Sequence, residues 1–267
     1  MTRNGPLSLL FHALFIGFIL APLLIVCVVA FTPLGYISLP TDRLSLRWFA
    51  AILDNPRFIS AFWLSLGLGT VSSLIATALA IGAALAIARH RFPGRDALSA
   101  FLLSPLMIPH IVLGVAFLRF FSSVGINGTF AGLAMGHVIV ILPFALRLVL
   151  AAATGMDPAI ERAAESLGAS RLTVFRRITL PLILPGIVSG WLLAFITSFD
   201  ELTMSVFIAS PSTTTLPVRM FLQIQDTIDP MVAAVSALLI AGTLALMLVL
   251  DRLVGLERLF VGKSRGR

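Results

Sequence analysis

Two adjacent acidic residues, Asp200 and Glu201, stand well inside an otherwise apolar segment of the chain. If that segment crosses a membrane, a carboxylate facing lipid near the centre costs about 2.5–3.5 kcal/mol, so at least one should face a bundle interior or a cavity. Neighbouring residues of a helix point about 100° apart, so both cannot line the same path unless the helix breaks there. We expect one to line a passage and the other to pack. The functional hypothesis is a passage or outer gate that favours cations. The alternative is an interhelical salt bridge or an interfacial carboxylate.

The chain lacks the residue patterns of familiar enzyme sites. It contains no HExxH motif, no GxSxG motif and no cluster of metal ligands. Gly262-Lys263-Ser264 matches the end of a phosphate-binding loop, but Glu257 occupies the position of its first glycine. Cys27 is the single cysteine, which excludes an intrachain disulfide. His110 and Arg119 lie near one apolar segment, where a lone His more often bonds a neighbouring helix. We predict no catalytic residue, no metal site and no cofactor.

A polar loop from Asp157 to Gly168 has the pattern of a short, capped helix. Asp157 suits the N-cap, Pro158 the first helical position, and Gly168 the left-handed residue just past the end. Ser170 can cap a second helix over residues 171–178, which leads to Leu180-Pro181 at the next apolar segment.

One face of the first short helix is apolar and small. The apolar residues recur at i, i+3, i+4 and i+7, and they are Ile160, Ala163, Ala164 and Leu167. An amphipathic helix at the lipid interface is the alternative reading. Paired alanines are weak lipid anchors, so the pattern favours close contact with another protein.

Six apolar segments surround these polar residues and must position them. They span residues 7–31, 58–88, 97–121, 128–153, 182–209 and 231–254, in a chain of 267 residues that is 58% hydrophobic and 12% charged. Runs of this length are typical of membrane spans, and they lack the alternation of barrel strands. We therefore predict an all-α, polytopic membrane bundle of six transmembrane helices.

The basic residues fall mainly on one side of this predicted bundle. With both termini in the cytoplasm, 14 of the 19 Lys and Arg residues lie inside, as the positive-inside rule requires. The net charge of +7 comes from short clusters between apolar runs, so it indicates lipid topology and no nucleic-acid partner.

Glycine and proline residues predict close packing and bends. Gly128, Gly132 and Gly136 in the fourth segment, and Gly186 and Gly190 in the fifth, recur at four-residue spacing, which lets another backbone approach. Pro105 and Pro109 interrupt the third segment and Pro143 the fourth, and each should bend its helix.

The polar loop resembles the EAA loop of permease subunits of binding-protein-dependent ABC importers, the MetI-like family. The matching positions are Ala163-Ala164, Gly168, Ile178 and Leu180-Pro181. Where the family usually has Glu, directly before the paired alanines, this chain has Arg162, and Glu161 lies one residue earlier. The resemblance implies a type I ABC importer permease fold and a loop, residues 154–181, that docks into a groove on an ATP-binding subunit. The residues implied in this coupling are Glu161, Arg162, Ala163, Ala164, Glu165, Leu167, Gly168, Ile178 and Pro181.

Further stretches look like the spermidine/putrescine type of permease. They are Ser198-Phe199-Asp200-Glu201, Pro211, Thr214-Thr215-Leu216-Pro217 and Pro105-Leu106-Met107-Ile108-Pro109. The resemblance implies a polyamine or a related small amine as the solute, with an opine or a phosphonate as alternatives. Asp200 and Glu201 would then belong to the solute path or gate.

The same resemblance implies the partners and the location. They are a second permease subunit, two ATP-binding subunits, an external solute-binding protein and the lipid of a bacterial inner membrane. We expect residues 1–57 to form a first helix and external loop, and residues 58–267 a five-helix core. A self-contained secondary transporter or channel is the main rival, but it needs no coupling loop. An intramembrane enzyme would need paired ionisable groups on facing spans.

Overall fold

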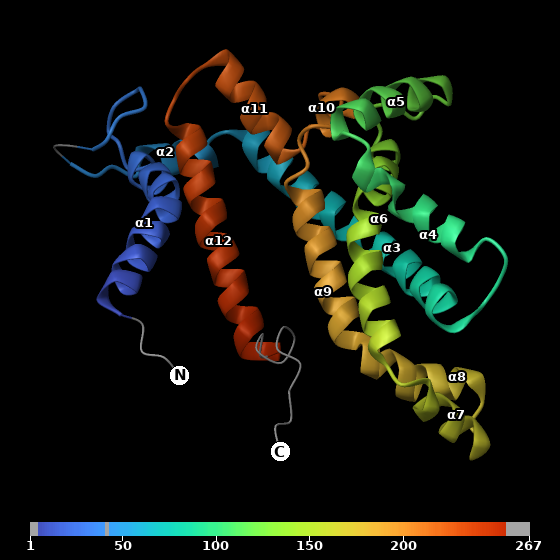
Figure 1. The fold of residues 1–267 in the computed structure, drawn as a ribbon. Coiled ribbons are helices and arrows are strands. Elements are labelled where there is room, and N and C mark those ends of the chain that lie inside the picture. Colours follow the sequence, from blue (N-terminus) through green and yellow to red (C-terminus); the bar gives the residue numbers. More distant parts are fainter. Residues whose placement is uncertain (1–4, 41–42, 255–267) are drawn as a thin grey trace. The chain divides into compact units, whose positions relative to one another are not determined.

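A computed structural model describes residues 5–40 and 43–254, and it is helical with no strand in those ranges. The helices are α1 (Pro6–Val29), α2 (Arg47–Leu53), α3 (Pro56–Arg89), α4 (Arg95–Leu103), the 3-10 helix η1 (Ser104–Met107), α5 (His110–Ser123), α6 (Phe130–Gly155), α7 (Pro158–Ser166), α8 (Arg171–Val174), the π-helix η2 (Phe175–Thr179), α9 (Leu180–Phe199), α10 (Ser205–Ile208), α11 (Leu216–Asp226) and α12 (Met231–Val254) (Figure 1). The prediction of an all-α membrane protein is confirmed.

Four helical stretches in the described residues are long and apolar enough to cross a membrane. They are Pro6–Val29, Pro56–Arg89, Phe130–Gly155 and Arg171–Phe199, and the bent pair α4–η1 and α5 makes a fifth if it counts as one span. The apolar part of α12, Met231–Ala245, is shorter. Six spans with cytoplasmic termini stay a prediction. The basic C-terminal residues used in it, and Gly262-Lys263-Ser264, lie outside the described residues.

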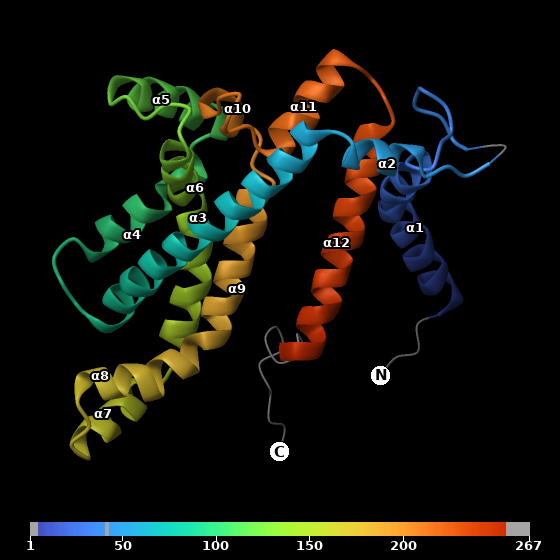
Figure 2. The same cartoon turned by 180° about the vertical axis from the view of Figure 1, so that it is seen from behind.

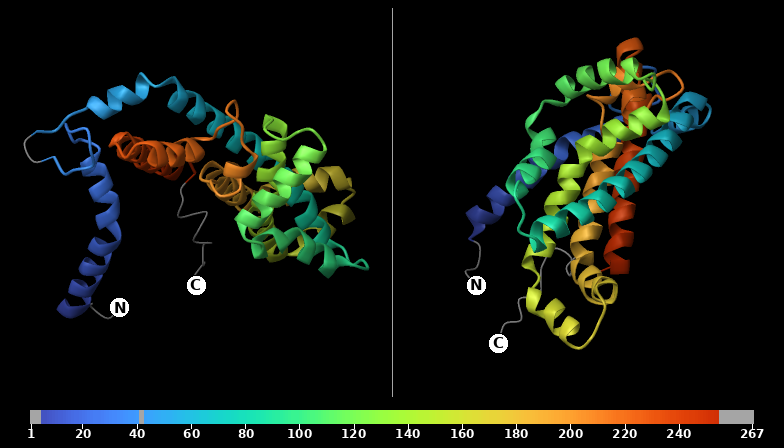
Figure 3. Two further views of the ribbon diagram at one scale, coloured as in Figure 1. Left: turned by 90° about the horizontal axis from the view of Figure 1, so that it is seen from above. Right: turned by 90° about the vertical axis from the view of Figure 1, so that its right-hand side faces the viewer.

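The chain divides into two compact units. Of the described residues, the first unit holds 5–60, apart from 41–42, and 219–254, and the second holds 61–218. In the first unit α12 contacts α1 and α2. Most apolar side chains of α1 are exposed, as expected of a helix that contacts lipid. Figure 3 shows α1 and α12 running in different directions, with α2 near the C-terminal end of α1.

Helices α6 and α9 form the centre of the second unit and run side by side (Figures 1 and 2). A Cβ atom at Gly186 would collide with Ala152 and lie 2.9 Å from the carbonyl oxygen of Leu148. At Gly190 it would lie 3.1 Å from the carbonyl oxygen of Ala145. The predicted close packing of these two glycines is confirmed, and α6 is the backbone that approaches them.

The third predicted segment is broken rather than merely bent. Its two halves, Arg95–Met107 and His110–Ser123, meet at 103°. Ile108 has an extended backbone, as residues before proline prefer, and Pro109 precedes α5. The predicted interruption at Pro105 and Pro109 is confirmed, and because the bend is so sharp, residues 97–121 do not form one continuous helix. In contrast, α6 continues through Pro143 without a break.

The fifth predicted segment is also shorter than expected. Helix α9 ends at Phe199, and only the short α10 follows after a turn. The expectation of one helix over 182–209 was wrong, because the Glu201 carboxylate accepts backbone N–H groups within the turn. At the other end, α8 and η2 run directly into α9, so the stretch from Arg171 to Phe199 is helical throughout.

Candidate functional site

Helix α7 is capped at both ends, as its sequence predicts. The side chain of Asp157 accepts a hydrogen bond from the Ala159 amide at 2.8 Å. Gly168 has a φ of +87°, a left-handed conformation that glycine adopts without strain. Ser170 then caps α8 through the amide of Thr173 at 3.3 Å. These caps make the loop a compact pair of short helices at one end of the second unit, beyond α6 and α9 (Figure 1).

Most of the predicted coupling residues are exposed. Leu167 is 90% exposed and Ile160 45% exposed, which are high values for large apolar side chains. Ala163, Arg162, Glu165 and Gly168 are also exposed, while Ala164 is half-buried. Farther along, Ile178 is half-buried and Pro181 is exposed. The small apolar stripe therefore presents an open surface in this chain.

Glu161 differs from its neighbours because it faces the rest of the second unit. Its Oε2 lies 3.0 Å from Nε of Arg89, at the end of α3. The geometry is that of an ion pair, and no linear hydrogen bond forms between the two groups. Its Oε1 accepts a hydrogen bond from Oγ1 of Thr179 at 2.6 Å. Of the residues implied in docking, Glu161 is thus held inside the chain.

Glu201 is the buried member of the acidic pair. Its carboxylate accepts hydrogen bonds from the amides of Met204 and Ser205 and from Oγ of Ser205, at 3.0–3.1 Å. His110 Nδ1 lies 3.2 Å from its Oε1. A carboxylate with several donors can be buried without loss of stability. Glu201 therefore organises the turn between α9 and α10.

Asp200 has the opposite environment, although it is the adjacent residue. It is the C-cap of α9 and it is exposed. The two adjacent side chains therefore lie in different environments, one packed and one exposed. Arg119, on α5, is exposed as well. The structure thus brings His110 and Glu201 together and leaves Asp200 and Arg119 outside that cluster.

Sequence reasoning missed His137, which is fully buried on α6. Its Nδ1 bonds Oγ of Ser198 at 2.8 Å, and its Nε2 bonds Oγ of Ser205 at 3.0 Å. These two serines stand on either side of the acidic turn, so one imidazole ring bridges the end of α9 and the start of α10. The signal available in the sequence was a polar ring inside the fourth apolar segment.

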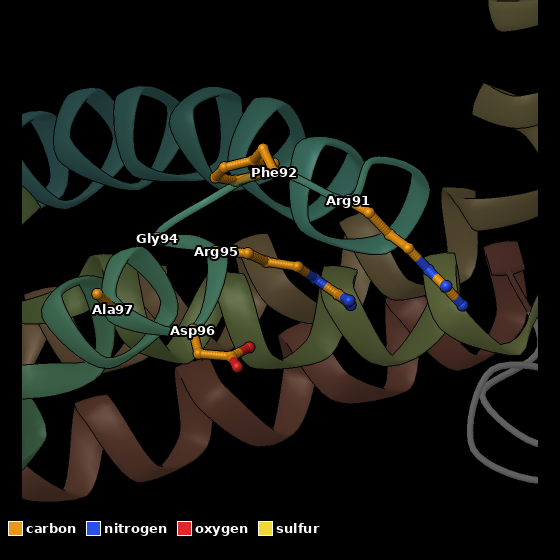
Figure 4. Close-up of a pocket in the computed structure, with 6 residues that line it drawn as sticks. All are labelled: Arg91, Phe92, Gly94, Arg95, Asp96 and Ala97. Carbon is orange, nitrogen blue, oxygen red and sulfur yellow. The ribbon is translucent and has the colours of Figure 1, made fainter.

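A basic hollow of about 300 Å³ lies where α3 turns into α4 (Figure 4). Arg91 and Arg95 line it and extend in the same direction, with Asp96 beside them. Both arginines belong to the group that the charge bias places in the cytoplasm. Among the residues that the structure describes, no three His, Cys, Asp or Glu side chains gather as a metal site would require.

Comparisons with known proteins agree with this architecture. Residues 76–256 match the family model described as binding-protein-dependent transport system inner membrane component. The chain is similar to the spermidine/putrescine transport system permease protein PotC of Haemophilus influenzae, with 33% identity over 94% of this chain and 95% of the relative.

Two solved structures have a similar fold. One is a bacterial ABC transporter involved in the import of the acidic polysaccharide alginate, with a TM-score of 0.73 and 16% identity over 95% of this chain and all of that chain. The other is the bacterial alginate ABC transporter in complex with an alginate pentasaccharide-bound periplasmic protein, with a TM-score of 0.67 and 20% identity. That match covers 93% of this chain and 94% of the other. At these identities, the likeness concerns the fold.

Proposed function

Because the chain belongs to the family of binding-protein-dependent transport system inner membrane components, we propose that it forms the solute path of an importer for a polyamine. It is a multi-pass permease subunit of an ABC importer in a bacterial inner membrane. Spermidine or putrescine is the proposed solute, on the strength of the relative that bears those names. An opine or a phosphonate is the alternative solute class.

The energy for transport comes, in this proposal, from separate subunits. The sequence carries no complete phosphate-binding loop, so ATP hydrolysis is assigned to two ATP-binding subunits. A second permease subunit completes the path, and an external solute-binding protein delivers the solute. The likeness to an ABC transporter solved with a periplasmic protein supports the external solute-binding protein in this proposal. We further propose that residues 58–267 form the permease core, and residues 1–57 a first helix and external loop.

One observation carries the coupling role of the loop 154–181. Helix α7 is short and capped, and it presents Leu167, Ala163 and Ile160 to the outside rather than to its own chain. An exposed apolar stripe on an ordered helix is typical of a docking surface. Ala163 and Ala164 keep that surface smooth, which allows a groove on a partner to approach closely.

The acidic pair contributes to the solute path in two different ways. The exposed Asp200 is proposed as the carboxylate that a cationic solute meets, while Glu201 holds the turn that presents it. Opposite charges attract over several ångströms, and the attraction grows where water is excluded. Asp200 and Glu201 thus serve the path or gate together, with only Asp200 in contact with solute.

The docking proposal is tested by replacing Leu167 with Asp in the assembled importer. Burying a leucine contributes about 1.5–3 kcal/mol, so its loss should weaken docking by roughly tenfold or more. Copurification of the ATP-binding subunits and solute-stimulated ATPase activity should both fall. The matched control is Leu44→Asp, at a leucine that is 72% exposed in the predicted external loop. Full coupling in the Leu167 variant would contradict the proposal, as would an equal loss in the control.

A further inference from the structure

Helix α7 is joined by short chain segments to α6 and α9, but not to α3. All three helices lie wholly or largely in the second unit. Two residues separate α6 from α7, and a short turn followed by α8 and η2 leads from α7 to α9. Helix α3 ends at Arg89, and four further helices follow it before α7 begins, so no short segment of the chain joins α3 to the loop. The ion pair between Arg89 and Glu161 supplies a direct connection.

The environment of Glu161 shields this ion pair from water. The side chains of Arg89 and Glu161 are only 15% and 18% exposed, and Thr179 is 4% exposed. A pair that is largely shielded from water is screened little by salt. The 2.6 Å distance from Thr179 Oγ1 to Glu161 Oε1 is typical of a hydroxyl bonded to a charged carboxylate. Each oxygen of one carboxylate therefore holds a different helix end.

Both helices held in this way belong to the packed core of the second unit. Ala76, Ala80 and Ala84 of α3 are fully buried, at a four-residue spacing that places them on one face. Ile183 of α9, near Thr179, is fully buried in the same cluster. Packed cores transmit displacement rather than absorb it. A movement at the Arg89 end or at the Thr179 end therefore moves a rigid helix.

We propose that Glu161 is a positioning residue that ties α7 to α3 through Arg89 and to α9 through Thr179. When an ATP-binding subunit displaces α7, the two transmembrane helices then move together. This inference rests on the proposed coupling role of α7, and it assigns Glu161 to transmission within the chain rather than to docking. The exposed Arg162 and Glu165 remain part of the docking surface.

The test uses the complete importer, with its ATP-binding subunits and solute-binding protein, in proteoliposomes. The single reversals Glu161→Arg and Arg89→Glu break the pair, and the double reversal restores opposite charges. In each single variant the ATP-binding subunits should copurify and hydrolyse ATP. Solute imported per ATP should fall about tenfold, which lies within the range by which mutations change the coupling between two sites. The double variant should recover a large part of that loss. Arg91→Glu, an equal charge change at an exposed residue close to Arg89, should leave the ratio unchanged.

A distance measurement separates positioning from a general loss of folding. Spin labels are placed at Ala159→Cys and His90→Cys, two exposed sites on α7 and just after α3, with Cys27 replaced by Ser. The distribution of label distances should be narrow with the native pair, broad in either reversal and narrow again in the double reversal. Unchanged transport per ATP and unchanged distances in the single variants would show that Glu161 does not connect α7 to α3. If the unaltered chain neither binds nor stimulates ATP-binding subunits, the proposed function itself fails, which is a different result.

Discussion

The residue scale explains why two adjacent carboxylates take different roles. Glu201 sits among amide and hydroxyl donors and is 5% exposed, whereas Asp200 caps the end of α9 in the open. A buried carboxylate needs its donors to remain folded, and an exposed one is free to meet a solute. Removing the charge of Asp200 should therefore change transport, whereas removing the charge of Glu201 should change stability.

Asp200→Asn should impair transport with little change in stability. The variant loses an attraction of about 1 kcal/mol or more for a cationic solute, which raises the KM for uptake by about fivefold or more. Uptake of labelled solute in proteoliposomes measures the KM, and thermal unfolding of the purified chain measures the stability. An unchanged KM would show that Asp200 does not meet the solute.

Glu201→Gln is the matched substitution for Asp200→Asn, because it removes the charge of the adjacent residue. Its amide group would oppose the donors that the carboxylate now accepts, so stability should fall by about 1–3 kcal/mol. If this variant unfolded like the unaltered chain and only its transport suffered, the structural role assigned to Glu201 would be wrong.

At the scale of elements, the contact between α6 and α9 rests on missing side chains. Gly186 lies against Ala152 and the carbonyl oxygen of Leu148. The backbone fixes where a Cβ atom would lie, so no side-chain rotamer could relieve a clash there. The rigidity of this pair matters for the proposed function, because α9 continues from η2 and α8, next to the coupling helix.

Gly186→Leu should therefore disrupt the helix pair. Overpacking of a tight contact costs about 1–3 kcal/mol, so the variant should unfold at a lower temperature and give less monodisperse protein. Gly82→Leu is the control, since a Cβ at that glycine of α3 meets nothing within 4 Å. Size-exclusion chromatography and thermal unfolding of both variants measure the difference. Equal stability of the two variants would contradict the packing argument.

At the scale of the whole molecule, the distribution of charge bears on the identity of the solute. Basic residues gather on the predicted cytoplasmic side. Asp200 is the C-cap of α9, and that end of α9 is the one away from the α7–α8 loop (Figure 1). An exposed carboxylate at that end attracts cations at short range. The exposed Asp200 is therefore compatible with a cationic solute such as an amine.

Uptake measurements with the assembled importer should identify that solute. With its own solute-binding protein and internal ATP, labelled putrescine or spermidine should accumulate in proteoliposomes, and each should compete with the other. Equal concentrations of an opine or a phosphonate should not compete. ATP-dependent accumulation of an opine, without competition by polyamines, would move the chain to another solute class.

The fold class and the short helix α7 could both be predicted from local features. Long apolar runs require helices in lipid, whatever their neighbours, so all-α architecture follows from segment length and composition. The caps of α7 depend on residues only a few positions apart, and Asp157, Ser170 and Gly168 act as their types predict. The contact between Gly186 and α6 was predictable in kind, because four-residue glycine spacing favours close packing.

The sequence by itself thus determined the membrane class, the short capped helix and the family resemblance, because each depends on run length or on residues close together in the chain. Only the tertiary structure decided that Glu161 pairs with Arg89, that His137 bridges Ser198 and Ser205, and that α9 ends at Phe199. Each of these depends on polar groups brought together by packing. A buried polar group must find a partner, but nothing in its local sequence specifies which distant residue that partner is.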